Sequence, residues 1–195
     1  MKKIFLMMNL IMCFVLVQAQ DQKESEPVKE PMKPALLVID IQNEYLKYMS
    51  DEDKKNGMEM INGAIWIARQ SNIPVIRIYH HDPKWGPQPG SESFEFPSSV
   101  VIKDTDPKVI KNFPSGFKKT ELDGILKEKD CNTLFLCGLS ATGCELATYH
   151  GGQDLDYHVF MLKGAIISHN SRLTSAVEDI CETVSLDTYM FMLTR

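Results

Sequence analysis

Runs of apolar residues alternate with segments of helical periodicity along most of the chain. Short unbroken apolar runs between polar or turn residues predict strands that are covered on both faces. Such runs occupy residues 35–39, 74–79, 133–137 and 157–162. Shorter extended pieces are expected at 100–103 and 109–111, and a last apolar run predicts a closing strand at 186–193. The segments between them predict helices over 58–70, 120–129, 144–155 and 171–184.

The alternation of strands and helices predicts the fold class. We expect an α/β domain of three αβα layers, with a central, mostly parallel, Rossmann-like sheet of about six strands. Ligands of such sheets bind beyond the carboxyl ends of the strands. Asp40, His80, His81 and Cys144 all follow predicted strands. We therefore expect them along one edge of the sheet.

The N-terminal part of the chain is not expected to belong to the fold. Residues 1–19 combine a basic start, an apolar stretch and a small residue before the predicted cleavage site, as in an export signal. A lipoprotein anchor at Cys13 is less favoured, because bulky residues precede it. Residues 20–33 are charged and proline-bearing, which predicts a disordered linker. The folded domain is expected at 34–195, exported to the periplasm or secreted, with no stable membrane insertion after cleavage.

Charge and cysteine content narrow the function classes. The formal net charge is −5, and no basic patch occurs, so nucleic acid is not an expected partner. Outside the signal the cysteines are Cys131, Cys137, Cys144 and Cys181, whose spacing fits no zinc motif. An exported chain with these cysteines permits disulfides, and the sequence leaves their pairing open.

Cys144 is the first candidate for a reactive side chain. It stands where a predicted strand gives way to a predicted helix, after the small residues 140–143. A helix N-terminus offers unpaired N–H groups and a partial positive charge, which would lower the pKa of a thiol. The competing interpretation is a buried structural cysteine, which base rates favour for a cysteine taken alone.

Three motifs give the chain a resemblance to a known family. Residues 40–43 read Asp-Ile-Gln-Asn after a strand, and residues 111–122 match Lys-x-x-x-Ser-x-Phe-x-x-Thr-x-Leu. Gly138 and Thr148 stand six residues before and four residues after Cys144. In this order the chain resembles the isochorismatase-like cysteine hydrolases, which include nicotinamidases and N-carbamoylsarcosine amidases.

The resemblance implies a catalytic triad of Asp40, Lys111 and Cys144. The thiolate would attack a carbonyl carbon and form a thioester-type intermediate, with the carboxylate as general base and acid. The ammonium would stabilise both anions. The resemblance also implies an oxyanion hole from the backbone N–H groups of Ser140 and Cys144, next to a cis bond between Leu139 and Ser140.

The expected substrate is a small amide, carbamoyl or ureido compound, whose C–N bond the enzyme would hydrolyse. His80, His81, Trp85 and Phe117 are expected to contact it. No cofactor is expected. The resemblance further implies a homo-oligomer.

The metal site of the nicotinamidase branch is not matched. His80, His81 and Asp82 are adjacent, so their side chains diverge and could not all hold one ion. We therefore expect no metal. Two alternatives stay open, a nicotinamidase-like amidase with a degraded metal site and a catalytically silent binding or assembly domain.

Overall fold

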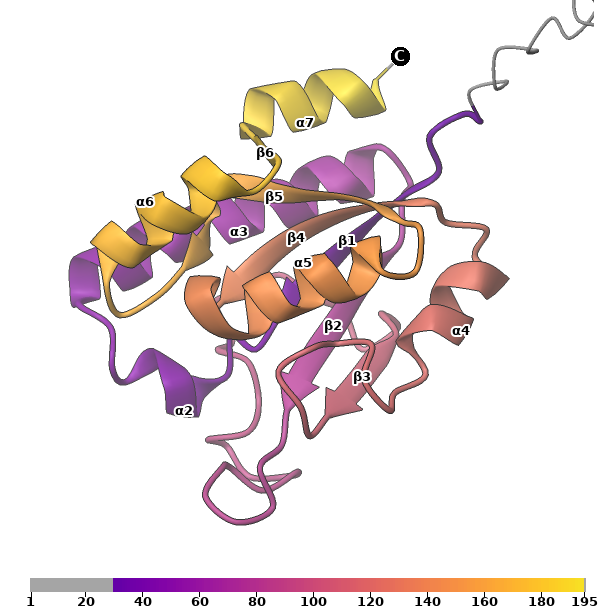
Figure 1. Cartoon of the computed structure of the whole chain (residues 1–195). Helices are drawn as coiled ribbons and strands as arrows, with labels where there is room; N and C mark the ends of the chain where they lie inside the picture. The colour runs from indigo at the N-terminus through magenta and orange to yellow at the C-terminus, as the bar shows by residue number, and fades with distance from the viewer. Residues whose placement is uncertain (1–29, 195) are drawn as a thin grey trace, which may run out of the picture. The chain divides into compact units, whose positions relative to one another are not determined.

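Six parallel strands form the central sheet, in the order β3-β2-β1-β4-β5-β6 (Figure 1). The computed structural model describes residues 30–194. The expected export signal at 1–19 and most of the linker at 20–33 lie outside these residues. The strands are β1 (Pro34–Ile39), β2 (Val75–His80), β3 (Lys108–Lys111), β4 (Thr133–Leu139), β5 (His158–Ile167) and β6 (Thr183–Val184). The predicted fold class is confirmed.

The helices lie on both faces of this sheet (Figure 1). They are α2 (Asn43–Leu46), α3 (Asp51–Gln70), α4 (Leu122–Glu128), α5 (Leu146–Gln153), α6 (Ser171–Ile180) and α7 (Leu186–Leu193), with a π-helical turn η1 (Ala141–Glu145) before α5. Helices α3 and α7 pack on one face, and α4, α5 and α6 contribute to the core on the other face. Among the described residues no helix is both long and apolar enough to span a membrane.

The two core layers follow from the strand pleat. Successive side chains of a strand point to opposite faces, so a strand buried on both faces needs an unbroken apolar run. In β1, Leu36 and Val38 join the core that includes α3, while Leu37 and Ile39 join the core that includes α5. Residues 35–39 are therefore apolar without interruption because consecutive side chains pack into two different cores.

The strand order places a natural binding site at the carboxyl end of β1. The chain leaves β1 toward β2 on one side and later returns to β4 on the other side. The strand order thus reverses between β1 and β4, and such switch points open a crevice outside the carboxyl ends of the strands.

The predicted closing strand at 186–193 is wrong, because this segment is helix α7. The side chain of Ser185 caps the helix by accepting a hydrogen bond from the N–H of Thr188, and Tyr189 is buried against Phe135 with ring centroids 4.5 Å apart. The sixth strand is instead the two-residue β6, which pairs with β5. The predicted extended piece at 100–103 belongs to the long loop between β2 and β3 and pairs with no strand.

Candidate active site

Most side chains of the candidate site come from the carboxyl ends of the strands. Asp40 follows β1, His80 ends β2 and Lys111 ends β3. Ser140 follows β4 and leads into η1, which carries Cys144. The register pairs His80 with Lys111 across β2 and β3, which brings these two side chains together. The predicted clustering at this edge is observed.

A buried ion pair forms the base of the site. Lys111 Nζ donates a hydrogen bond of 2.7 Å to Asp40 Oδ2, and both side chains are almost fully excluded from water. Burial raises the pKa of Asp40, and the charge of Lys111 opposes that rise. Asp40 Oδ1 has no hydrogen-bond partner among the described residues. This oxygen is therefore available to accept a proton.

Cys144 lies beside the carboxylate, with its Sγ within 4.8 Å of an Asp40 oxygen. Burial and then the negative charge of Asp40 raise the pKa of the thiol to about 12, against the opposing effect of Lys111. The expected lowering of this pKa by the helix N-terminus is therefore wrong. Exclusion from water and the adjacent carboxylate outweigh the ammonium of Lys111. At neutral pH Cys144 is therefore a thiol, which would need a base before it could act as a nucleophile.

Gln42 fixes the position of His80. Its fully buried side chain accepts a hydrogen bond from the His80 N–H at 2.7 Å and donates one to the His80 carbonyl at 3.1 Å. These two bonds join the ends of β1 and β2. They hold the His80 ring where its Nδ1 lies 3.1 Å from Lys111 Nζ. Burial, and then the charge of Lys111, lower the pKa of His80.

Two further motif residues position the backbone around Cys144. Gly138 has a φ of 135°, and a Cβ there would collide with the carbonyl oxygen of Ile39 on the adjacent strand. Thr148 Oγ1 accepts a 2.9 Å hydrogen bond from the N–H of Gly116, which ties α5 to the loop after β3. The Leu139–Ser140 peptide bond is cis, as the resemblance implied.

Asp40, His80 and Cys144 also form a possible metal-ligand set. One oxygen, one ring nitrogen and the sulfur lie within 4.8 Å of one another. The set does not fit a resident divalent cation, because Lys111 already places a positive charge against Asp40 and His80. An ammonium only donates, so His80 Nδ1 accepts, and the neutral ring then carries its proton on Nε2. A metal would first have to displace Lys111.

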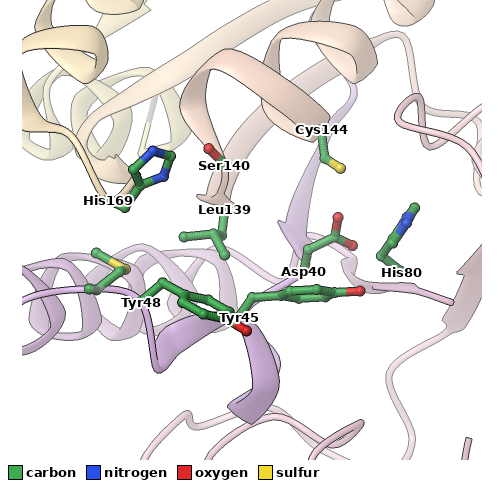
Figure 2. A pocket seen from close by; sticks show the side chains of 9 residues that line it. Asp40, Tyr45, Tyr48, His80, Leu139, Ser140, Cys144 and His169 are labelled. Carbon is green, nitrogen blue, oxygen red and sulfur yellow. The ribbon is translucent and has the colours of Figure 1, made fainter. Parts of the chain in front are cut away.

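The side chains of Asp40, His80 and Cys144 border a cavity of about 470 Å³. Figure 2 shows these three side chains gathered at one end of it, with His169 at the opposite end and the rings of Tyr45 and Tyr48 alongside. The complete lining consists of Asp40, Tyr45, Tyr48, Met49, His80, Leu139, Ser140, Cys144 and His169. The volume is within the range of small-molecule sites.

Three of the predicted substrate contacts lie outside this lining. His81 Nε2 lies 3.3 Å from Gln88 Oε1 in the loop after β2. The side chain of Trp85 is 83% exposed in the same loop. Phe117 stacks on Tyr157, with ring centroids 5.8 Å apart. Of the four predicted contact residues, only His80 borders the cavity.

Sequence reasoning missed several residues of the lining. Tyr45 belongs to the short helix α2, while Tyr48 and Met49 follow it, and no periodicity marks a helix of four residues. His169 was detectable in principle. It stands two residues after β5, so the rule that placed Asp40 at the carboxyl edge of the sheet applies to it as well.

Comparison with known proteins agrees with the fold. An isochorismatase-like hydrolase from Alkaliphilus metalliredigens superposes with a TM-score of 0.74, at 20% identity, covering 82% of this chain and 98% of that one. N-carbamoylsarcosine amidase from Thermoplasma acidophilum superposes with a TM-score of 0.70, at 24% identity, covering 80% of this chain and 98% of that one. The isochorismatase family protein YddQ of Bacillus subtilis is 26% identical over 160 residues, 80% of this chain and 81% of the relative.

The class of protein follows from these observations. The domain has the α/β fold of the isochorismatase-like hydrolases, with a carboxylate, an ammonium and a thiol together at the carboxyl edge of its sheet. The sequence model of the isochorismatase domain matches residues 34–182, well over half of the chain. The chain belongs to the isochorismatase family.

Proposed function

We propose that this chain is a cysteine hydrolase that cleaves the C–N bond of a small amide, carbamoyl or ureido compound without a metal ion. The observation that carries the proposal is the buried Lys111–Asp40 pair, 2.7 Å between Nζ and Oδ2, with the Cys144 thiol beside it. A buried ion pair beside a thiol and open to a cavity supplies a base, a cation and a nucleophile together.

In the first half-reaction Cys144 attacks the substrate. The Sγ–H proton passes to Asp40 as the Sγ–C bond forms, and the carbonyl π electrons move onto oxygen. Collapse of this adduct breaks the C–N bond, and the leaving nitrogen takes the proton from Asp40. Ammonia or an amine departs and a thioester, or a thiocarbamate from a urea, stays on the enzyme. The thiol pKa of about 12 makes proton transfer to Asp40 part of this step.

In the second half-reaction water replaces the nitrogen. Asp40 removes a proton from the water, whose oxygen bonds to the acyl carbon. Cleavage of the C–Sγ bond then returns the sulfur, which regains the proton from Asp40. The product is a carboxylic or carbamic acid, and the resting thiol is restored.

The other groups have supporting roles in the proposal. Lys111 holds Asp40 in place and offsets negative charge on the carboxylate and the thiolate. The backbone N–H groups of Ser140 and Cys144 are proposed to bind the oxyanion. His80, with its proton on Nε2, is proposed to donate a hydrogen bond to the substrate.

Ammonia release from a panel of amides, carbamoyl compounds and ureas tests the proposal on the full chain. The wild type and Cys181→Ala should hydrolyse at least one of them, because the Cys181 thiol is not part of the cavity lining. Cys144→Ala should be folded and inactive. Hydrolysis by Cys144→Ala at the wild-type rate would refute the proposed role of Cys144 as the nucleophile. Binding without hydrolysis by the wild type would favour a silent binding domain.

A further inference from the structure

Beyond the reacting groups, most of the cavity lining is apolar. Tyr45, Tyr48, Met49 and Leu139 form this apolar part, and Ser140 and His169 add polar groups. The Tyr45 hydroxyl stays protonated, because burial and then the charge of Asp40 raise its pKa. When an apolar ring or chain covers these side chains, apolar surface of both partners leaves water, and this burial favours binding. A substrate with an apolar body would therefore gain affinity along this part of the cavity.

No lysine or arginine borders the cavity among the described residues. Lys111 contacts two lining residues, Asp40 and His80, but it is fully buried and does not border the cavity. The carboxylate in the lining is Asp40. A carboxylate on the substrate would approach this anion without a matching cation, which costs free energy unless a partner neutralises it.

The size of the cavity also favours a substrate that is larger than its reacting group. About 470 Å³ is more than a carbamoyl group alone fills. The reacting side chains sit at one end, and the lining continues past Tyr48 to His169 at the other end (Figure 2). The part of the substrate that stays bonded to the carbonyl has room to extend along this direction.

We infer that the substrate is an uncharged amide or urea with a bulky apolar group, which lies along Tyr45, Tyr48 and Leu139. This inference rests on the proposed function, because it assigns the substrate class of the same site. The reacting carbonyl lies at the end formed by Asp40 and Cys144. The apolar group extends toward His169.

A matched pair of amides tests the inference on the full chain. 3-Phenylpropanamide carries a phenyl ring on its third carbon, 4-carbamoylbutanoate carries a carboxymethyl group on the same carbon, and propanamide carries neither. We expect kcat/KM for 3-phenylpropanamide to exceed that for each of the other two by at least about tenfold, the usual scale of discrimination by an apolar pocket. A preference for 4-carbamoylbutanoate would overturn the inference. Loss of that preference in His169→Gln would then identify His169 as an anion site.

Adding a cation to the lining should weaken the preference for the apolar amide. Tyr48 is 71% exposed, so Tyr48→Arg can be made without disturbing the core. It should raise kcat/KM for 4-carbamoylbutanoate and lower it for 3-phenylpropanamide, narrowing their ratio at least about tenfold. Trp66→Arg introduces the same charge at another exposed aromatic, on α3, outside the lining, and should leave the ratio unchanged. An unchanged ratio in Tyr48→Arg would count against the inference.

Binding to Cys144→Ala separates the inference from the proposed function. Calorimetry should show tighter binding of 3-phenylpropanamide than of 4-carbamoylbutanoate. If the wild type hydrolyses no amide while this binding order holds, the proposed function fails and the pocket assignment stands. If the wild type hydrolyses amides but prefers the carboxylate, the inference fails and the proposed function stands. Absence of both binding and hydrolysis would overturn the inference.

Discussion

Lys111 Nζ lies 3.1 Å from His80 Nδ1 while it donates a 2.7 Å hydrogen bond to Asp40. One ammonium therefore contacts both an acid and an imidazole. Because the ammonium can only donate, the imidazole must be neutral with its proton on Nε2. The fully buried lysine thus determines which proton the site can offer to a substrate.

Replacing Lys111 should change the titration of His80. In the wild type the pKa of His80 is lowered from its ordinary 6.5, first by burial and then by Lys111. Lys111→Met removes the second cause, so the pKa of His80 should rise toward its ordinary value. NMR titration of the imidazole Cε1–H resonance measures this. Lys108→Met, on the same strand, is the matched control and should leave His80 unchanged. An unchanged His80 pKa in Lys111→Met would refute the contact between the Lys111 ammonium and His80.

Removing the carboxylate should affect turnover and thiol reactivity in opposite directions. Asp40→Asn removes the proposed base, so hydrolysis should fall by about 10²–10⁴-fold. It also removes a charge that raises the pKa of Cys144, now about 12, while Lys111 remains to lower it. The thiolate fraction at pH 7 should grow about tenfold for each unit by which the pKa falls.

The larger thiolate fraction of Cys144 in Asp40→Asn is measured as a faster modification of this residue by iodoacetamide, which mass spectrometry follows. Asp154→Asn removes an exposed carboxylate at the end of α5 and should change neither rate. Slower modification in Asp40→Asn would mean that the carboxylate promotes the thiolate in the resting enzyme.

The clustering of Asp40, Lys111 and Cys144 could be predicted from the sequence, and their catalytic role stays a proposal. These residues belong to motifs with fixed spacing at or just beyond strand ends, and parallel strands bring their carboxyl ends together. Local pattern and global topology agree there. The thiol pKa was mispredicted because a helix terminus is visible in sequence, whereas burial beside a carboxylate needs the fold.

The end of the chain was harder to predict. A short apolar run is compatible with a strand or with a buried helix. The pattern at residues 186–193 predicts a strand, but the segment is helix α7. Ser185, which caps α7, was the available signal. The cavity wall near Tyr48 could not be predicted, because a four-residue helix and the loop after it carry no periodicity.

Gly138 should tolerate no side chain. Its φ of 135° is unfavourable for any other residue, and an alanine Cβ would collide with the Ile39 carbonyl. Gly138→Ala should lower the free energy of unfolding by at least about 1–3 kcal/mol, the scale of backbone strain alone. Gly124→Ala, in α4 with open space around it, should instead stabilise by up to about 1 kcal/mol. Urea unfolding measures both, and equal effects would contradict the close approach of β1 and β4.

Glu145 should make the stability of the fold depend on pH. It is fully buried next to Cys144, and neither carboxyl oxygen has a hydrogen-bond partner among the described residues. Burial, and then the charge of Asp40, raise its pKa well above the ordinary 4.5. Its folded form therefore keeps a proton that the unfolded chain releases. The resulting stability is fully present below the unfolded pKa and is lost as pH rises from about 4.5 through the raised folded pKa.

Glu145→Gln keeps the shape of the side chain and removes this titration. The variant should lose less stability than the wild type between pH 5 and pH 8, the difference growing by up to about 1.4 kcal/mol per pH unit within the window. Urea unfolding at a series of pH values measures the two curves. Glu128→Gln, at the exposed end of α4, controls for the loss of a surface carboxylate. Parallel curves for the wild type and Glu145→Gln would mean that Glu145 is ionised in the folded protein and that its charge is compensated.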